Sequence, residues 1–323
     1  MAELTAVPVL VTGATGFIGS HVVDALLALD ADVHALTSTV SSVYPQRLLG
    51  VRDRVTLHEG SLADRSAMDA VAETVRPQVV FHLGAYTHVG KSWQRVDECV
   101  QVNVQGTVNL LQALAPFGYE KLVYTGTSEI YGDVEVPFHE DGPVNPISPY
   151  AVSKYAGERY CRMFHQGKGW PVVMVRPFNA YGPAQSPDRV VPEIIVRALR
   201  GQPLLMTQGR QTRELNYVTD LARGFVAAAL HGQPGRLYNL GCGEEVSMRD
   251  LAQLLLRLMG DPIVAQFGAL PERPTEIWRM HADASRARAE LHWEPTVSLE
   301  EGLGRTIDWY KRELGREQSS FAV

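Results

Sequence analysis

The chain has 323 residues, 45% of them hydrophobic, so it can bury a large core. Its net charge of -6 offers no broad basic surface, which disfavours binding to nucleic acid or to an anionic membrane. Three distant cysteines argue against a disulfide framework, and ten histidines without a shared ligand spacing argue against a metal centre. No apolar run approaches a membrane span and no signal peptide precedes the first strand, so we expect a cytoplasmic protein.

Strand-like and helix-like segments alternate through the first half of the chain. The expected strands cover residues 7–11, 32–36, 55–59, 78–82, 121–125 and 172–176. Two of the expected helices stand out: one spans 93–115, and the other carries Lys154 and runs to about Gln166. This alternation predicts an α/β fold with a doubly wound parallel sheet, the Rossmann architecture.

The pattern changes after Pro177, where frequent prolines break the chain into shorter elements. We therefore expect a dinucleotide-binding domain over residues 1–177 and a smaller substrate-binding lobe over 178–323. The alternating residues at 236–240 predict a strand that returns to the main sheet. Residues 216–242 are accordingly expected to belong to the first domain.

The first strand leads into the glycine loop GATGFIG at residues 13–19, and a helical pattern follows at once. Gly13, Gly16 and Gly19 permit the backbone to approach a pyrophosphate closely. That group would then lie at the positive end of the helix dipole. Because strand, glycines and helix arrive in this order, the loop predicts dinucleotide binding.

Five polar residues downstream of this loop predict alcohol oxidation followed by chemistry on the ketone. Tyr150 and Lys154 are one helical turn apart, so Lys154, beside an oxidised nicotinamide, is expected to lower the pKa of Tyr150 and make it a base. Glu129 follows a strand end, where ligands bind in such sheets, and is expected to act as a base on a carbon beside the ketone. Thr127 and Ser128 offer hydroxyls at the same place, although both could be turn residues.

Seven segments, in order, resemble the extended short-chain dehydrogenase/reductases of the nucleotide-sugar epimerase/dehydratase type. They are TGATGFIGSH, FHLGA, VNVQGT, TGTSEIYG, SPYAVSK, VRPFNAYGP and RELNYVTDLARG, and together they extend over nearly the whole chain. The resemblance implies NAD or NADP as a tightly bound cofactor that is regenerated in each cycle. It also implies a nucleoside diphosphate sugar as substrate and a homodimer built by the two helices named above through a four-helix bundle.

The triplet Thr127-Ser128-Glu129 narrows the reaction. The resemblance implies that Glu129 removes the C5 proton of a hexose already oxidised at C4, with Thr127 near O4 and Ser128 near the leaving C6 hydroxyl. The triplet is similar to the triplets of GDP-mannose 4,6-dehydratases, of the dehydratases of legionaminic acid routes and of UDP-glucuronate decarboxylases. The 4-epimerases commonly carry a small uncharged residue at the position of Glu129. The flanking segments SPYAVSK and VRPFNAYGPAQS favour dehydration to a 4-keto-6-deoxy sugar, with decarboxylase and 4-epimerase as open alternatives. A non-catalytic dinucleotide sensor is disfavoured because Glu129, Tyr150 and Lys154 are all present.

The resemblance also implies the binding residues. Asn179, Arg213 and Arg273 are expected to bind the diphosphate of the substrate, since the arginine fork suits phosphate oxygens. The expected cofactor-binding residues are Gly13, Thr15, Gly16, Phe17, Ile18, Gly19, Thr37, Ser38, Ser61, Leu62, Leu83, Ala85, Asn103, Tyr150, Lys154 and Pro177. The second strand ends at Thr37 and Ser38 with neither an acid for NAD nor an arginine for NADP, so both cofactors stay open. The missing carboxylate favours NADP.

Overall fold

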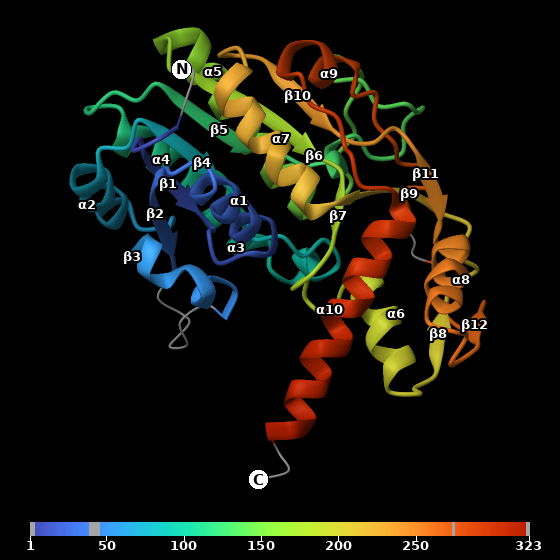
Figure 1. Cartoon of the computed structure of the whole chain (residues 1–323). Helices are drawn as coiled ribbons and strands as arrows, with labels where there is room; N and C mark the ends of the chain where they lie inside the picture. Colours follow the sequence, from blue (N-terminus) through green and yellow to red (C-terminus); the bar gives the residue numbers. More distant parts are fainter. Residues whose placement is uncertain (1–3, 39–45, 273–274, 321–323) are drawn as a thin grey trace.

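Seven parallel strands form the central sheet, in the order β10-β6-β5-β4-β1-β2-β3 (Figure 1). They are β1 (Pro8–Thr12), β2 (Asp32–Thr37), β3 (Val55–Glu59), β4 (Val79–His82), β5 (Lys121–Thr125), β6 (Val172–Pro177) and β10 (Leu237–Leu240). The computed structural model describes residues 4–38, 46–272 and 275–320. It confirms the doubly wound fold, the six predicted strands and the return of the strand at 236–240 to the main sheet.

Helices cover both faces of this sheet, which explains why its strands are apolar on both sides. Val9 and Val11 of β1 belong to the core beneath α1 (Phe17–Leu27) and α7 (Val218–His231). Leu10, between them, belongs to the core on the opposite face. That face is covered by α2 (Arg65–Val75), α4 (Gly106–Leu114) and α5 (Pro149–Lys168).

The helix predicted over 93–115 is interrupted, which corrects the sequence-based expectation. A short 3-10 turn over Gly90–Gln94 precedes α3 (Val96–Glu98), a π-helical stretch over Cys99–Gln105, and then α4. Within the π-helical stretch, the Asn103 side chain is buried and bonds to the backbone of Tyr86. These bonds join the π-helical stretch to the loop after β4. By contrast α5 is regular, capped by Ser148 at its start and ended by Gly169 with φ +70°.

The second lobe has its own small sheets and its own core. One sheet has the order β11-β9-β7 and the other pairs β12 with β8. Their strands are β7 (Asn179–Tyr181), β8 (Leu204–Met206), β9 (Thr212–Tyr217), β11 (Glu245–Ser247) and β12 (Ala265–Phe267), and they pack with α6 (Val190–Leu199), α8 (Met248–Leu258) and α10 (Leu299–Ser320). The long α10 crosses the front of the molecule in Figure 1.

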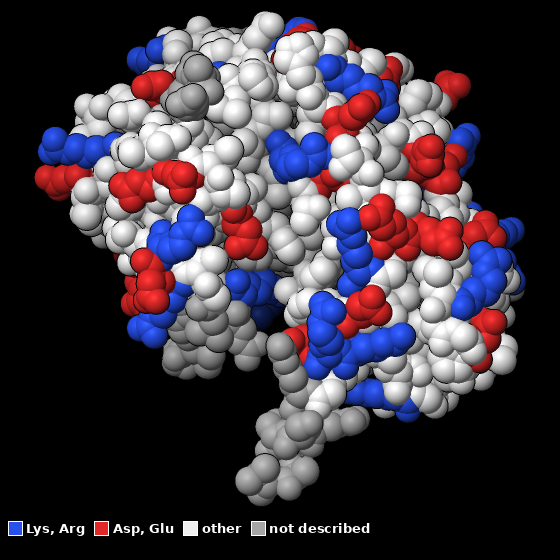
Figure 2. Space-filling view, viewed as in Figure 1, with Lys and Arg blue, Asp and Glu red and all other residues white. Residues whose placement is uncertain are grey.

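One late segment packs with the first lobe, which no pattern in the sequence indicated. Helix α9 (Ser285–Leu291) contributes Ala287 and Leu291 to the core around α7 and β10, and Trp293 joins them. The chain therefore passes between the lobes more than once, and a boundary after Pro177 stays a prediction. Acidic and basic side chains are interspersed over the face seen in Figure 2. Of the helices that the structure describes, none has the length and apolar character needed to cross a membrane.

Candidate active site

A cavity of about 1240 Å³ lies between the lobes, at the carboxyl ends of the central strands. Figure 2 shows a hollow between the two lobes. Nearly all the residues singled out in the sequence line the cavity: Gly13, Thr15, Gly16, Phe17, Ile18, Gly19, Thr37, Ser38, Ser61, Leu62, Leu83, Ala85, Thr127, Ser128, Glu129, Tyr150, Lys154, Pro177, Asn179 and Arg213. The volume exceeds that of a site for one drug-sized ligand, so it has room for a cofactor and a substrate together.

The glycine loop is shaped for a dinucleotide. Gly13 has φ +69°, and a Cβ there would lie 2.6 Å from the backbone nitrogen of Gly84. A Cβ on Gly19 would lie 2.1 Å from the carbonyl oxygen of Gly13, so the helix can approach the loop only at a glycine. Helix α1 begins without a side-chain cap and without an acid in its first turn. These features fit a pyrophosphate at the positive end of α1.

One expected binding residue, Asn103, does not line the cavity. Asn103 lies behind the wall, where its amide donates to Ser153 at 2.9 Å and to the Tyr86 carbonyl at 3.1 Å, and its side-chain oxygen accepts from the Tyr86 N–H at 2.8 Å. It thus orders the loop after β4 and the helix that carries Lys154, instead of facing a ligand. Arg273 lies outside the described residues.

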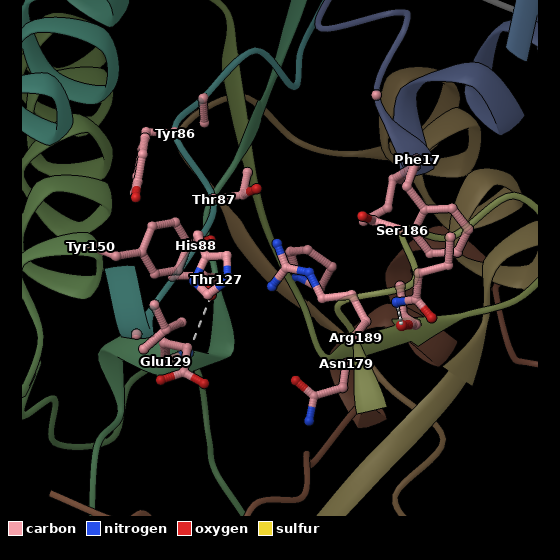
Figure 3. A pocket seen from close by; sticks show the side chains of 18 of the residues that line it. Phe17, Tyr86, Thr87, His88, Thr127, Glu129, Tyr150, Asn179, Ser186 and Arg189 are labelled. Atoms are coloured by element: carbon pink, nitrogen blue, oxygen red, sulfur yellow. Dashed lines mark hydrogen bonds between the residues drawn. The ribbon is translucent and has the colours of Figure 1, made fainter. Parts of the chain in front are cut away.

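Tyr150, Thr127 and Glu129 gather on one side of the cavity (Figure 3). Tyr150 comes from the first turn of α5, whereas Thr127 and Glu129 follow the end of β5. The Thr127 hydroxyl accepts a hydrogen bond from the Glu129 N–H at 3.3 Å, which shapes the turn and aims both side chains. The carboxyl end of β5 and the capped start of α5 therefore bring the Tyr150 phenol to a hydroxyl and a carboxylate that lie more than 20 positions earlier in the chain.

The groups of the chain itself raise the pKa of Tyr150, so the lowering expected from Lys154 together with an oxidised nicotinamide stays a prediction. The pKa of Tyr150 is raised to about 12, chiefly by burial and also by the Glu129 carboxylate, while the Thr127 hydroxyl and Arg189 oppose the shift. Lys154 is not among the groups that lower it. The physical reason is that burial disfavours the phenolate more strongly than the groups of the chain favour it. These groups alone therefore keep Tyr150 protonated.

Lys154 is held in a buried position beneath the cavity. Burial lowers its pKa to about 8, although the Cys161 and Glu158 side chains oppose this shift. Glu158 is paired with Arg176 through two bonds of 2.9 and 2.7 Å, and both partners are buried. At neutral pH the amine is therefore largely a cation, close to the point where it loses its proton.

Ser128 is less accessible than the sequence suggested. Its side chain is only 2% exposed, and its hydroxyl donates to the Met280 sulfur at 3.4 Å. The amide of Asn179 also points to this sulfur, at 3.9 Å. Met280 is thus a neighbour of two predicted site residues, and no motif in the sequence indicated it.

The cationic side of the cavity comes from the second lobe. Arg213, on β9, donates to the Glu276 carboxylate at 2.5 Å and to the Ile277 carbonyl at 2.7 Å. Arg189, at the start of α6, points into the cavity between Glu129 and Asn179 (Figure 3). As a residue for binding the diphosphate, Arg189 is a weaker candidate from the sequence than Arg213, which stands in the matching segment RELNYVTDLARG. Its place at the N-terminal boundary of α6 supplies that direction.

His88 is a lining residue that sequence reasoning missed. It follows β4 and lies beside Thr127 in the view of Figure 3. The Lys91 N–H donates to its Nδ1 at 3.2 Å, and its Nε2 lies 3.4 Å from Asp188. Its pKa is lowered by burial and by the charges of Arg189 and Lys91. His82 takes a structural position instead: both ring nitrogens pair with buried threonine hydroxyls, and its pKa falls to about 3.

Comparisons with known proteins agree with this geometry. A model of the NAD dependent epimerase/dehydratase family matches residues 9–241. A dTDP-glucose 4,6-dehydratase of Streptomyces griseus is 35% identical over 94% of this chain and 94% of its own length. A UDP-glucose 4-epimerase of Mycolicibacterium smegmatis is also 35% identical, over 94% of this chain and 98% of its own.

The fold comparison points the same way. A solved dTDP-glucose 4,6-dehydratase from Streptomyces venezuelae, with NAD bound, has a TM-score of 0.88 and 31% identity over 95% of this chain and 98% of that one. Sequence, sheet order and glycine loop thus lead to one conclusion. The chain belongs to the NAD dependent epimerase/dehydratase family of extended short-chain dehydrogenase/reductases, and its cofactor is a nicotinamide dinucleotide.

Proposed function

We propose that this enzyme is a nucleotide-sugar 4,6-dehydratase that forms a 4-keto-6-deoxy sugar nucleotide. The observation that carries the proposal is the position of Glu129, a carboxylate in the same cavity as Tyr150 and close enough to raise the pKa of that phenol. A 4-epimerase needs the oxidising pair but no base at C5. A carboxylate beside that pair is what abstraction of the C5 proton requires.

Each residue then has a distinct task. Tyr150 takes the proton of the C4 hydroxyl, with Lys154 as the buried cation that favours its phenolate and Thr127 as the hydroxyl beside O4. A bound oxidised nicotinamide supplies the hydride acceptor and a positive charge that favours the phenolate. Glu129 removes the C5 proton, which is acidic because the C4 ketone stabilises the carbanion as an enolate. The C6 hydroxyl leaves with a proton as water, and the hydride and a proton return to C6 and C5.

The substrate's diphosphate would lie against the second lobe. Asn179, Arg189 and Arg213 line this side of the cavity, and the two guanidinium groups offer permanent charge and paired N–H donors. Because Arg213 is paired with Glu276 and fixed by backbone carbonyls, it is pre-oriented toward an anion. We include Arg273 as a further candidate on the sequence pattern alone.

A 4-epimerase is the second candidate, and the comparisons favour it as much as dehydration. A relative of each kind is 35% identical to this chain. Overall sequence identity therefore does not distinguish 4,6-dehydration from 4-epimerisation. Our preference for dehydration depends on Glu129, the side chain that we propose acts at C5. UDP-glucuronate decarboxylation is a third outcome that the same experiment detects.

The test is product mass on a panel of GDP-mannose, UDP-GlcNAc, UDP-glucuronate and dTDP-glucose. Loss of about 18 mass units, one water, from any of them would support dehydration, and loss of about 44, one carbon dioxide, would mean decarboxylation. An isomer of unchanged mass would mean epimerisation. A product without water loss across the whole panel contradicts the proposal.

We also propose a homodimer. Apolar side chains stand exposed along one face of the first lobe: Val100 at 50% on the π-helical stretch, and Val152 at 52% and Met163 at 49% on α5. These elements pack against each other in the chain, so the exposed residues can form one continuous patch. Exposed apolar surface of this kind is typical of a subunit interface.

A further inference from the structure

The end of the cavity that would hold the adenosine lies over β1, β2 and β3. These strands are neighbours at one side of the sheet, and the cavity is lined there by the glycine loop, Thr37, Ser38 and Ser61. In such folds the 2'-position of the adenosine ribose lies at the end of the second strand. The hydroxyls of Thr15 and Thr37, 3.4 Å apart, mark this point.

Arg47 reaches the same point from a later segment. It belongs to the 3-10 segment Gln46–Arg54 and lines the cavity. Its Nη1 donates to the Thr15 carbonyl at 3.1 Å, and its Nε donates to the Ala184 carbonyl at 2.9 Å. Ala184 has φ +62°, an unusual conformation for a residue with a side chain, and it presents its carbonyl to the guanidinium. Two backbone carbonyls thus fix the direction of Arg47.

These contacts orient the charge of Arg47 without neutralising it. Both partners are neutral carbonyls, and within the described residues no carboxylate forms an ion pair with this guanidinium. The acids that line the cavity are Glu98, Glu129, Asp188, Glu193 and Glu276, and none of them follows β1, β2 or β3. After Asp32, the next Asp, Glu, Lys or Arg in the sequence is Arg47. This end of the cavity therefore combines a fixed cation with hydroxyl groups.

We propose that Arg47 reads the 2'-phosphate of the cofactor, so that the enzyme binds NADP in preference to NAD. The guanidinium gives the phosphate a charge-assisted partner, while Thr37 and Ser38 supply hydroxyls where an NAD enzyme would hold an acid. The inference deepens the proposed function because it concerns the same dinucleotide site. It holds whichever sugar reaction follows, since it depends on binding alone.

The test is a comparison of dissociation constants by calorimetry, on protein freed of co-purified nucleotide. Wild-type protein should bind NADP at least about tenfold more tightly than NAD, the range expected for one charged hydrogen-bond pair. Arg47→Gln should weaken NADP by roughly 10- to 100-fold and NAD by less than about threefold. Arg52→Gln is the matched control, because Arg52 is on the same segment but does not line the cavity; it should leave the NADP-to-NAD ratio unchanged.

Competition with 2',5'-ADP and 5'-AMP isolates the adenosine half. Wild-type protein should prefer 2',5'-ADP, and Arg47→Gln should lose that preference. If Arg47→Gln lost affinity for NAD and NADP equally, the proposal would be overturned. Arg47 would then have a structural role, holding the Thr15 and Ala184 backbones together through its two hydrogen bonds. Wild-type protein that binds NAD as tightly as NADP would overturn it as well. A failed dehydratase assay with an intact NADP preference would count against the reaction and not against this site.

Discussion

The Lys154 ammonium lies 4.6 Å from the centre of the Tyr124 ring, and the Tyr124 hydroxyl donates to the Lys154 carbonyl at 2.8 Å. Tyr124 of β5 thus contacts the buried ammonium with its ring and joins helix α5 to the sheet through its hydroxyl. Gly157 makes the contact feasible, because a Cβ there would lie 2.4 Å from the Tyr124 hydroxyl. The ring face favours a cation in this dry position. Burial nevertheless lowers the pKa of Lys154, and a pH dependence follows.

The rate should fall at alkaline pH. Lys154 has a pKa of about 8, so its ammonium is present below this pH and lost above it. In the proposed mechanism the Lys154 ammonium acts with the nicotinamide charge to favour the Tyr150 phenolate, and the neutral amine cannot. The value of kcat/KM should therefore decline from about pH 8 upward, and from a lower pH when an oxidised nicotinamide adds positive charge. A pH profile with the cofactor saturating measures this limb. A rate that stays level to pH 10 would contradict the role of Lys154.

Tyr150→Phe should fold and bind cofactor but lose roughly two to four orders of magnitude in turnover, the usual range for a proton-transfer group. The ring and its packing remain, and only the hydroxyl is removed. Tyr155→Phe is the matched control, because Tyr155 lies on the same helix without lining the cavity. Steady-state rates and cofactor affinity of both variants decide the point. Near-normal turnover of Tyr150→Phe would remove this residue from the mechanism.

Glu129→Gln should allow oxidation at C4, since Tyr150 and Lys154 remain, and should block the elimination that follows. Reduced cofactor should then build up, with absorbance near 340 nm, roughly the reduced-nicotinamide band. Glu135→Gln, at an exposed position beyond the cavity, should behave like wild type. In deuterated water the wild-type product should carry deuterium at C5. A wild-type product with neither deuterium at C5 nor loss of water would reject the dehydratase assignment.

Val152→Glu should convert a dimer into a monomer. Val152 is 52% exposed on α5, and a charge in an apolar interface would be buried without a partner. Val264→Glu is the control, since Val264 is 82% exposed on the other lobe. Light scattering coupled to size-exclusion chromatography gives the mass of each variant. A monomeric wild-type protein would contradict the proposed dimer. A Val152→Glu variant that stays dimeric would mean that the interface lies elsewhere.

Glu158→Gln should reduce the free energy of unfolding by about 3 to 5 kcal/mol, because it leaves the buried Arg176 without its charged partner. Glu301→Gln breaks an exposed pair with Arg305 one helical turn away and should cost at most about 1 kcal/mol. Urea denaturation of the two variants and the parent measures both changes. Equal effects would mean that burial of the Arg176 pair adds nothing to stability.

The sequence alone determined the order of elements and the type of chemistry. The glycine loop, the alternating strands and the Tyr150–Lys154 spacing are local patterns, and local patterns report on backbone geometry and on residues one turn apart. They predicted the parallel sheet and the return of β10, whereas most of the cavity-lining residues were named from the resemblance to the family. The carboxyl ends of parallel strands meet at one edge, so even Glu129 could be placed near Tyr150.

The features that depend on contacts between distant segments were decided only by the tertiary structure. Arg47 reaches Thr15 and Ala184 across 32 and 137 positions, so no local pattern could place it beside Thr37. The pKa of Tyr150 depends on burial by the whole fold, which the Tyr-x-x-x-Lys spacing does not contain. The position of Asn103 was also not predictable from a local pattern, because its side chain is hydrogen-bonded to the backbone of Tyr86. Orientation, burial and charge partners are properties of the packed molecule, because each is set by residues that folding brings together.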